Sequence, residues 1–310
     1  MIATVTLNPS LDEWVELPEL RLGQLNRASR IARYPGGKGI NVSRVIHELG
    51  GRTIALALAA GADGRILSQR LSDLHIQHEF VTIAGSTRNN YKILAAGSVL
   101  TEINTAGPDA PASALSTLRR RLLRPPLPRC VVFSGSLPPR APASIYRDWI
   151  RALRQHRVPA ALDTSGAALR QGLSARPWLI KPNREETEEL LGRRLSSLTA
   201  AVDAVRVLLR RGPGVVILSL GRAGAVLGST ELAELWMARP PTLTAHPAVG
   251  AGDSLVGGFL TAYASERSAV EAFRWGMACG AATAMAPGTE LCHRRDVLRL
   301  LPRVRLRRLS

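Results

Sequence analysis

Residues 130–135 read CVVFSG, and residues 158–166 read VPAALDTSG. Each stretch is a short run of small and β-branched apolar residues followed by Ser, Gly, Asp or Thr, which is typical of a buried strand that ends in a polar loop. Residues 143–155, between them, have the apolar spacing of a helix. A strand, a helix and a second strand in this order predict a βαβ unit, and therefore parallel strands.

The same alternation extends along most of the chain. We expect further strands over residues 2–7, 53–59, 77–83, 178–183 and 214–221, and further helices over residues 39–49, 64–74, 112–123, 184–191, 197–210 and much of 252–302. This order predicts an α/β fold in which helices flank a mostly parallel central sheet. The length of 310 residues suits one such domain spanning 1–310.

Two segments, residues 10–33 and 87–104, do not fit this alternation. The second resembles a β-hairpin with its turn at Gly97-Ser98. We expect the two segments to form a small β-sheet that acts as a lid over one end of the larger domain.

Composition excludes several classes of protein. The net charge is +17, but the arginines are spread along the chain, and we find neither zinc-finger spacing nor an aromatic RNA-binding motif, so nucleic-acid binding is not expected. The amino terminus lacks the pattern of a secretory signal, and the apolar runs are too short to cross a bilayer. The three cysteines are widely spaced. We therefore expect a cytoplasmic protein without disulfides.

Lysine is rare in this arginine-rich chain. Of 41 basic residues, three are lysines: Lys38, Lys92 and Lys181. Lysine carries a compact charge with three rotatable donors, whereas the arginine head group is larger and planar. The three lysines therefore indicate places where an ammonium group must fit closely against an anion.

The stretch AVGAGDSLVGGFL, residues 248–260, has the strongest chemical signal. Small residues directly before a helix expose backbone amides, and the helix dipole adds positive charge, so this turn suits anionic oxygens. Asp253 follows directly. A carboxylate there repels phosphate, but it suits a general base that takes a proton from an attacking hydroxyl. The alternative is an N-terminal capping aspartate after a glycine turn.

Two further stretches carry lysines. PGGKGIN, residues 35–41, brings glycine backbone and Lys38 together but lacks the spacing of a Walker A loop. In TRNNYKI, residues 87–93, alternation places Arg88, Asn90 and Lys92 on one face of a strand, which suits a phosphate and hydroxyl groups. A solvated turn and a solvated hairpin face remain the alternatives.

The stretch KPNREE, residues 181–186, suggests a metal site. Asn183 and Glu186 are three residues apart and share a helix face, where an amide and a carboxylate could hold the water shell of Mg²⁺. The alternative is an acidic helix start that the helix dipole favours.

These motifs, together with SGSLPP (134–139), DTSG (163–166) and SLGRAG (219–224), resemble in their order the ribokinase-like PfkB family of carbohydrate kinases. The resemblance covers nearly the whole chain and implies ATP as phosphoryl donor and Mg²⁺ as cofactor. It implies that Asp253 is the catalytic base, and that the amides of Gly250, Ala251 and Gly252 form the anion hole. It also implies that Asn183 and Glu186 belong to the magnesium motif. Lys181, Asn183, Ser219, Gly221, Gly224, Gly250 and Gly252 would lie at the nucleotide, which residues 219–224 and 245–250 would border.

The stretches TLNPSLD (6–12), LNR (25–27) and TEINTAGP (101–108) resemble the branch of this family that acts on hexose phosphates. We expect fructose 1-phosphate as the substrate, with fructose 6-phosphate or tagatose 6-phosphate as alternatives. APGTELCHRRD (286–296) is more similar to the fructose 6-phosphate enzymes. The substrate-binding residues implied are Asp12, Arg27, Gly37, Lys38, Asn41, Arg88, Asn90 and Lys92.

Other functions remain open at this stage: a kinase of a neutral sugar or nucleoside, or a sensor that binds a sugar phosphate without catalysis. The expected partners are ATP and a sugar phosphate, and the exposed strand edges of a lid suggest a homodimer formed through it.

Overall fold

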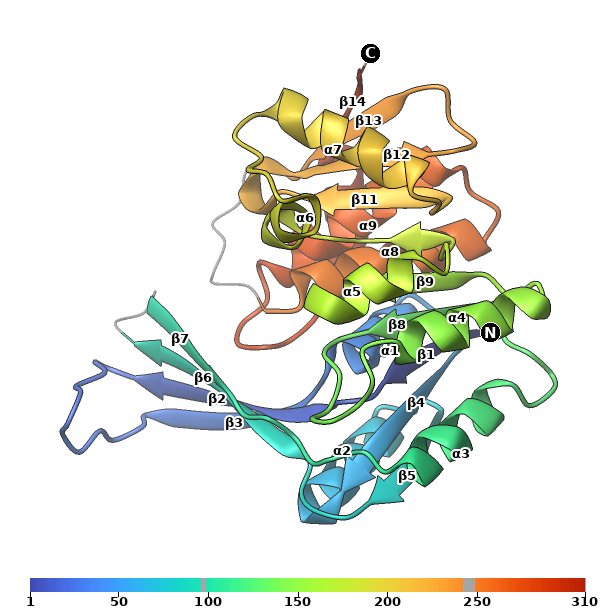
Figure 1. Ribbon diagram of the computed structural model, residues 1–310. Coiled ribbons are helices and arrows are strands. Elements are labelled where there is room, and N and C mark those ends of the chain that lie inside the picture. The colour runs from blue at the N-terminus through green and yellow to red at the C-terminus, as the bar shows by residue number, and fades with distance from the viewer. Residues whose placement is uncertain (96–98, 242–248, 310) are drawn as a thin grey trace.

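The computed structural model describes residues 1–95, 99–241 and 249–309, and contains two β-sheets (Figure 1). The larger sheet has ten strands in the order β14-β13-β12-β11-β10-β9-β8-β1-β4-β5. Their bounds are β1 (Ile2–Thr6), β4 (Thr53–Ala60), β5 (His78–Ile83), β8 (Cys130–Ser134), β9 (Ala160–Asp163), β10 (Leu179–Ile180), β11 (Val215–Ser219), β12 (Ala225–Ser229), β13 (Leu235–Arg239) and β14 (Arg305–Leu309).

Along the sheet, neighbouring strands in the order β11-β10-β9-β8-β1-β4-β5 pair in parallel, as the alternating sequence predicts. The predicted α/β fold with a mostly parallel sheet is therefore confirmed. β12, β13 and β14 extend the sheet in antiparallel pairing and were not predicted. The basic C-terminal segment is thus an edge strand, in which Arg305 to Leu309 pair with β13.

Helices cover both faces of the large sheet (Figure 1). One face packs against α3 (Ala112–Leu122), α4 (Ile145–Gln155), α5 (Gly166–Leu173) and α7 (Leu198–Arg210). The other packs against α1 (Lys38–Glu48), α2 (Gly61–Asp73), α8 (Ala251–Ala264), α9 (Ala269–Thr283) and α10 (Arg294–Leu300). The short helix α6 (Arg184–Leu191) follows β10.

Glycine allows α1 and α8 to pack closely. A Cβ atom on Gly257 would lie 2.8 Å from the Cβ of Val45, which is closer than side chains approach. This contact brings the first turns of the two helices to the same edge of the sheet, and both first turns carry predicted site residues.

The smaller sheet has the strand order β3-β2-β6-β7 and projects from the body of the molecule (Figure 1). Its strands are β2 (Ser10–Leu17), β3 (Arg30–Gly36), β6 (Arg88–Ala95) and β7 (Val99–Asn104). The two segments that interrupt the alternation therefore do form a separate sheet. The predicted hairpin turn at Gly97-Ser98 lies outside the described residues.

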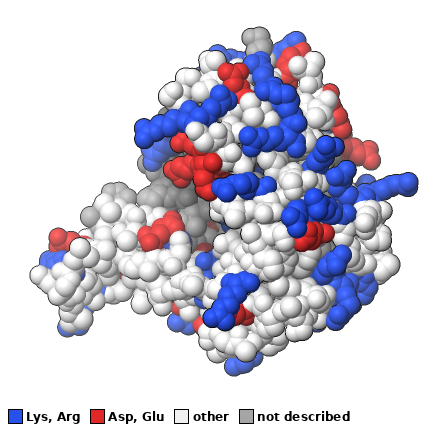
Figure 2. Space-filling view, in the orientation of Figure 1, with Lys and Arg blue, Asp and Glu red and all other residues white. Residues whose placement is uncertain are grey.

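The three cysteines are buried and free. In the described part of the chain, we find no helix with the length and apolarity needed to cross a membrane. Figure 2 shows Lys and Arg distributed over the visible face, with acidic side chains among them, rather than gathered in one basic patch.

Candidate active site

The carboxyl ends of the parallel strands place the predicted motifs at one edge of the large sheet. Asp163 ends β9, Lys181 follows β10, and Ser219 ends β11. An isolated bridge joins Asn183 to Ser219, so the two predicted nucleotide residues lie side by side. This edge is where ligands bind in open α/β sheets.

Asp253 lies in the first turn of α8, directly after a glycine turn. Gly250 precedes the helix with φ of +87°, a conformation that glycine adopts at little cost. The first amides of a helix have no partner within it, so those of Ala251 and Gly252 are available to an anion. Asn41 of α1 donates to Asp253 Oδ2 over 2.9 Å, which fixes the carboxylate beside the predicted anion hole.

Burial changes the acidity of this carboxyl group. Asp253 is 6% exposed. Desolvation raises its pKa to about 7; the nearby negative charge of Asp163 acts in the same direction, while the ammonium group of Lys38 opposes it. A carboxylate with a pKa near neutrality is a suitable general base at physiological pH.

Two of the three lysines meet at this edge. Lys38, the first residue of α1, and Lys181 both lie beside the carboxylate of Asp163, with Nζ–Oδ1 distances of 3.6 Å and 3.1 Å. The charge of Asp163 raises the pKa of Lys38 above its ordinary value, so this ammonium group stays protonated. A Cβ atom on Gly252 would lie 3.4 Å from Lys181 Nζ, which places this ammonium group beside the anion hole.

The smaller sheet brings a second polar cluster toward the site. Asp12 on β2 pairs in register with Asn90 on β6, and Asn90 Nδ2 donates to Asp12 Oδ1 over 3.1 Å. Ser10 Oγ donates to the same oxygen over 2.8 Å. A Cβ atom on Gly36 would lie 2.5 Å from Asp12 Oδ1, so this cluster lies against the glycine turn that begins α1. Asp12 and Asn90 can hold hydroxyl groups of a sugar.

The predicted cations of the smaller sheet have different surroundings. Lys92 is buried, and its ammonium group donates to Glu102 Oε2 over 2.5 Å and to Asn104 over 3.2 Å. Arg88 donates to the backbone oxygens of Asn8 and Thr105. Both cations thus have partners within the chain, which a substrate phosphate would have to replace or share.

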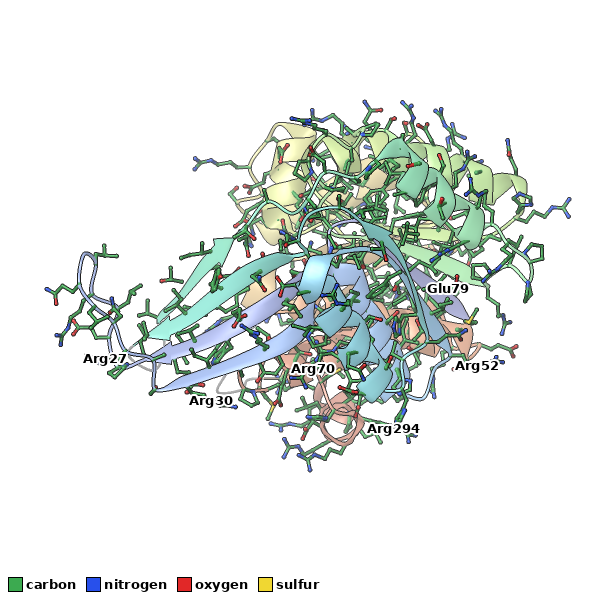
Figure 3. All side chains as sticks on the ribbon, turned by 90° about the horizontal axis from the view of Figure 1, so that it is seen from below. Arg27, Arg30, Arg52, Arg70, Glu79 and Arg294 are labelled. Carbon is green, nitrogen blue, oxygen red and sulfur yellow. The ribbon has the colours of Figure 1, made fainter. Side chains whose placement is uncertain are left out.

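Arg27 is exposed and lies at the distal end of the smaller sheet (Figure 3). The chain does not bring it to the cluster around Asp12. Its predicted contact with substrate stays a prediction, and within this chain it would need a movement of the sheet.

Asn183 and Glu186 form a capping box at the start of α6. Asn183 Oδ1 accepts from the amide of Glu186 over 2.8 Å, and Glu186 Oε2 accepts from the amide of Asn183 over 2.9 Å. The second oxygen, Glu186 Oε1, lies 3.9 Å from Lys38 Nζ. Among the described residues, no group of three or more acidic, histidine or cysteine side chains could hold a metal directly. The arrangement therefore fits Mg²⁺ held through water at Glu186 Oε1, and not a direct cage.

The predicted nucleotide loop follows β11. Gly221 and Gly224 have φ of +60° and +107°, and a Cβ atom on Gly224 would overlap the backbone oxygen of Ala238, so this turn requires glycine at 224. The other predicted border, residues 245–250, lies outside the described residues up to 248.

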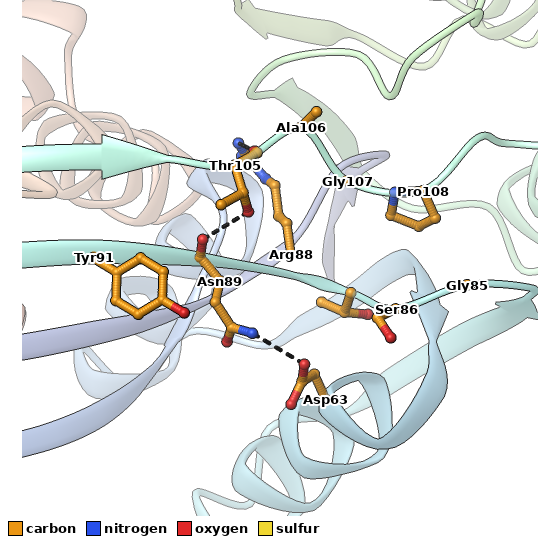
Figure 4. A pocket seen from close by; sticks show the side chains of 11 residues that line it. Asp63, Gly85, Ser86, Arg88, Asn89, Tyr91, Thr105, Ala106, Gly107 and Pro108 are labelled. Atoms are coloured by element: carbon orange, nitrogen blue, oxygen red, sulfur yellow. Dashed lines mark hydrogen bonds between the residues drawn. The ribbon is translucent and has the colours of Figure 1, made fainter.

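A cavity of about 480 Å³ lies where the smaller sheet meets α2 (Figure 4). Arg88 and Asn89 line it, and Asn89 donates to Asp63 at its wall. Asp253 and the two lysines beside Asp163 are not among its lining residues, so the predicted anion hole does not form part of its wall.

Sequence reasoning missed three residues of this site. Asp163 stands in the DTSG stretch, but its role was not recognised, because the two lysines that it contacts come from distant parts of the sequence. Asn8 donates to Ser136 Oγ over 3.3 Å, and its backbone oxygen accepts from Arg88, so these residues form a polar group at the base of the smaller sheet. Position directly after a parallel strand is the signal that could have found them.

Comparison with known proteins agrees with this geometry. The profile of the pfkB family carbohydrate kinases matches residues 5–295. The chain is 35% identical over 309 residues to 1-phosphofructokinase from Bacillus subtilis (strain 168), with 100% of each chain covered. It is 33% identical over 309 residues to 1-phosphofructokinase from Escherichia coli (strain K12), covering 98% of this chain and 97% of that one.

Among solved structures, phosphofructokinase-2 from Escherichia coli in complex with substrates and products superposes with a TM-score of 0.92. Its sequence identity is 30%, over 97% of this chain and 98% of that one. Fold, site and sequence together define an ATP-dependent sugar kinase. The chain belongs to the pfkB family of carbohydrate kinases.

Proposed function

We propose that this kinase transfers the γ-phosphoryl group of ATP to a ketohexose monophosphate, and that fructose 1-phosphate is its preferred substrate. The single observation that carries the proposal is the buried polar face of the smaller sheet, on which Asp12, Asn90 and Lys92 lie together. It places Lys92 two residues beyond Asn90, on the same face as Asp12. The name of the relatives at 33–35% identity favours fructose 1-phosphate among the ketohexose phosphates.

The proposed chemistry begins with orientation. Asp12 and Asn90 accept and donate hydrogen bonds to the sugar hydroxyls, while Lys92, or Arg88 at the base of the sheet, binds the phosphate already present. The smaller sheet acts as a lid that excludes water and directs the free hydroxyl toward Asp253.

Asp253 then accepts the proton of the attacking hydroxyl as the hydroxyl oxygen bonds to the γ-phosphorus of ATP, while the bond between that phosphorus and the β–γ bridging oxygen breaks and ADP leaves. Asn41 keeps the accepting carboxylate in place through its 2.9 Å hydrogen bond. The amides of Ala251 and Gly252 and the ammonium groups of Lys38 and Lys181 stabilise negative charge on the phosphoryl oxygens. Mg²⁺, held through water at Glu186, would supply further neutralisation of the ATP phosphates.

The smaller sheet also supports a proposal about assembly. It exposes large apolar side chains, among them Ile31 and Ile103, which are 61% and 50% exposed. We propose that two chains associate through these sheets. Size measurement at micromolar concentration tests this, because Ile31→Lys should produce monomers if the surface is an interface.

A second substrate is favoured by one observation, the high structural similarity to phosphofructokinase-2 from Escherichia coli. A structure of that enzyme in complex with fructose 6-phosphate superposes with a TM-score of 0.90, so fructose 6-phosphate is the alternative. A coupled ADP-release assay with Mg-ATP decides the matter by comparing fructose 1-phosphate, fructose 6-phosphate, tagatose 6-phosphate and fructose at equal concentration. We expect fructose 1-phosphate to exceed the others by more than about tenfold in kcat/KM, a transition-state preference of about 1.4 kcal/mol. A preference for unphosphorylated fructose would refute the proposal.

A further inference from the structure

Asp163 occupies an unusual position at the carboxyl end of β9. Its side chain is 1% exposed, yet two ammonium groups approach the same oxygen, Oδ1, from different elements. Lys38 comes from the first turn of α1, and Lys181 follows β10. In a chain whose basic residues are otherwise almost all arginine, two of the three lysines therefore converge on one buried carboxylate.

The two lysines that contact Asp163 also lie near the residues proposed above for phosphoryl transfer. Lys181 Nζ is beside Gly252 of the anion hole, and Lys38 acts electrostatically on Asp253. The Lys38 side chain is 40% exposed, whereas Asp163 is closed off behind the lysines. Asp163 is therefore not placed to touch the substrate itself; its charge raises the pKa of Asp253, and its close polar contacts toward the anion hole are those with the two lysines.

We propose that Asp163 is a positioning residue of the kinase reaction, which holds Lys38 and Lys181 with their remaining N–H groups directed at the transferred phosphoryl group. Two ammonium groups repel each other, and each is carried on a flexible stem. A shared carboxylate offsets the repulsion and restricts both stems before substrate arrives. Each ammonium group has three donors, so a contact with Asp163 leaves two for phosphate oxygens. Donors fixed in advance in this way are what stabilises a transition state.

Two other roles would account for burial of an acidic side chain here. Asp163 could be purely structural, since Ser134 Oγ donates to its Oδ2 over 3.3 Å. It could also bind the metal that accompanies ATP. The three roles differ in what they predict for kcat, for the magnesium requirement and for the dependence on the lysines.

The proposal rests on the phosphoryl transfer proposed above, so the turnover of the unaltered enzyme with fructose 1-phosphate and Mg-ATP is measured first. Asp163→Asn, which keeps the size of the side chain, should then lower kcat by roughly 10²-fold, the scale of losing a transition-state donor. KM for the sugar phosphate and the magnesium concentration at half-maximal rate should change by less than about threefold, because neither is bound by Asp163. Asp148→Asn, at an exposed salt bridge with Arg147, is the matched control.

The lysines provide the decisive comparison. In the Lys38→Met/Lys181→Met background, adding Asp163→Asn should have almost no further effect on kcat, because no ammonium group is left to position. If Asp163→Asn alone does not fold, Lys181→Met is compared with Lys181→Met/Asp163→Asn, which removes one positive and one negative charge together. A further fall of about tenfold in kcat is expected from the loss of Asp163 acting through Lys38.

Three results would overturn the proposal. Unchanged kcat in Asp163→Asn, or in the paired comparison, would leave a structural role. A magnesium requirement raised by tenfold or more would make Asp163 a metal ligand. An undiminished effect of Asp163→Asn in the background without both lysines would mean that it acts by another route. A wild-type enzyme inactive on every sugar phosphate would instead refute the proposed function.

Discussion

Replacing Asp253 with asparagine should abolish most of the activity and at the same time stabilise the fold, in a manner that depends on pH. Burial raises the pKa of Asp253 to about 7, against an ordinary value near 4. The native state therefore binds this proton more tightly than the unfolded chain does. The stabilising contribution of the protonated group is fully present below about pH 4 and is lost as the pH rises to about 7.

The amide introduced by Asp253→Asn would carry no charge at any pH, and its oxygen would still accept the hydrogen bond from Asn41. At pH 8, a rise of the pKa of Asp253 from about 4 in the unfolded chain to about 7 in the native state lowers the free energy of unfolding by about 4 kcal/mol, compared with a group whose pKa does not change. At pH 5 part of this loss in free energy of unfolding is already present. The advantage of Asp253→Asn in free energy of unfolding should therefore grow by about 2–3 kcal/mol between pH 5 and pH 8.

The assay is urea unfolding followed by tryptophan fluorescence at both pH values, together with kcat at pH 8. We expect kcat to fall by roughly 10²–10⁴-fold, the usual contribution of a positioned acid–base group. Asp148→Asn is the control, because its exposed carboxyl group has a lowered pKa and should give no gain at pH 8. Near-normal turnover would refute the assignment of Asp253 as the base. If the difference in free energy of unfolding between Asp253→Asn and the unaltered protein is the same at pH 5 and pH 8, burial does not raise the pKa of Asp253.

Three further predictions concern other parts of the site. Gly250→Ala should destabilise the fold by about 1–2 kcal/mol and lower kcat, because φ is +87° and the new Cβ would lie 2.7 Å from Leu291 Cδ2. Gly50→Ala is the control, since Gly50 has φ of +83° and open space around it; it should be destabilising without loss of kcat. Equal kcat in the two variants would contradict the anion hole. Lys92→Ala should raise KM for the sugar phosphate about tenfold and leave KM for ATP unchanged, as initial-rate kinetics would show; an unchanged sugar KM removes Lys92 from the site. Glu186→Gln should raise the magnesium concentration at half-maximal rate several-fold while the exposed neighbour substitution Glu185→Gln does not, and identical magnesium titrations would argue against a water-held metal at Glu186.

The sequence was sufficient to predict most elements of the large sheet, because buried strands and amphipathic helices carry local periodicity. The antiparallel strands β12 to β14 escaped prediction. β12 and β13 follow the glycine-rich turn at 219–224 and are short, and β14 is rich in arginine, so its pattern is that of a charged tail. Its strand conformation depends on pairing with β13, a contact about 70 residues away.

The residues of the candidate site could likewise be predicted only in part. Asp253, Lys38 and the glycine turns stand in stretches whose composition indicates their chemistry. The convergence of Lys38 and Lys181 on Asp163 could not be predicted from local patterns, because it depends on the order of the strands in the folded sheet. The capping box of Asn183 and Glu186 shows the opposite case, since the spacing that predicted a metal site also forms a helix start, in which Glu186 Oε1 takes no part.

³¹P NMR of a reaction with Mg-ATP and fructose 1-phosphate shows directly whether this kinase phosphorylates a sugar that already carries a phosphate. We expect the γ-phosphate signal of ATP to decrease in step with the appearance of a second phosphate ester on the sugar, at C6. Release of inorganic phosphate without a new ester, or the absence of any reaction, would contradict it.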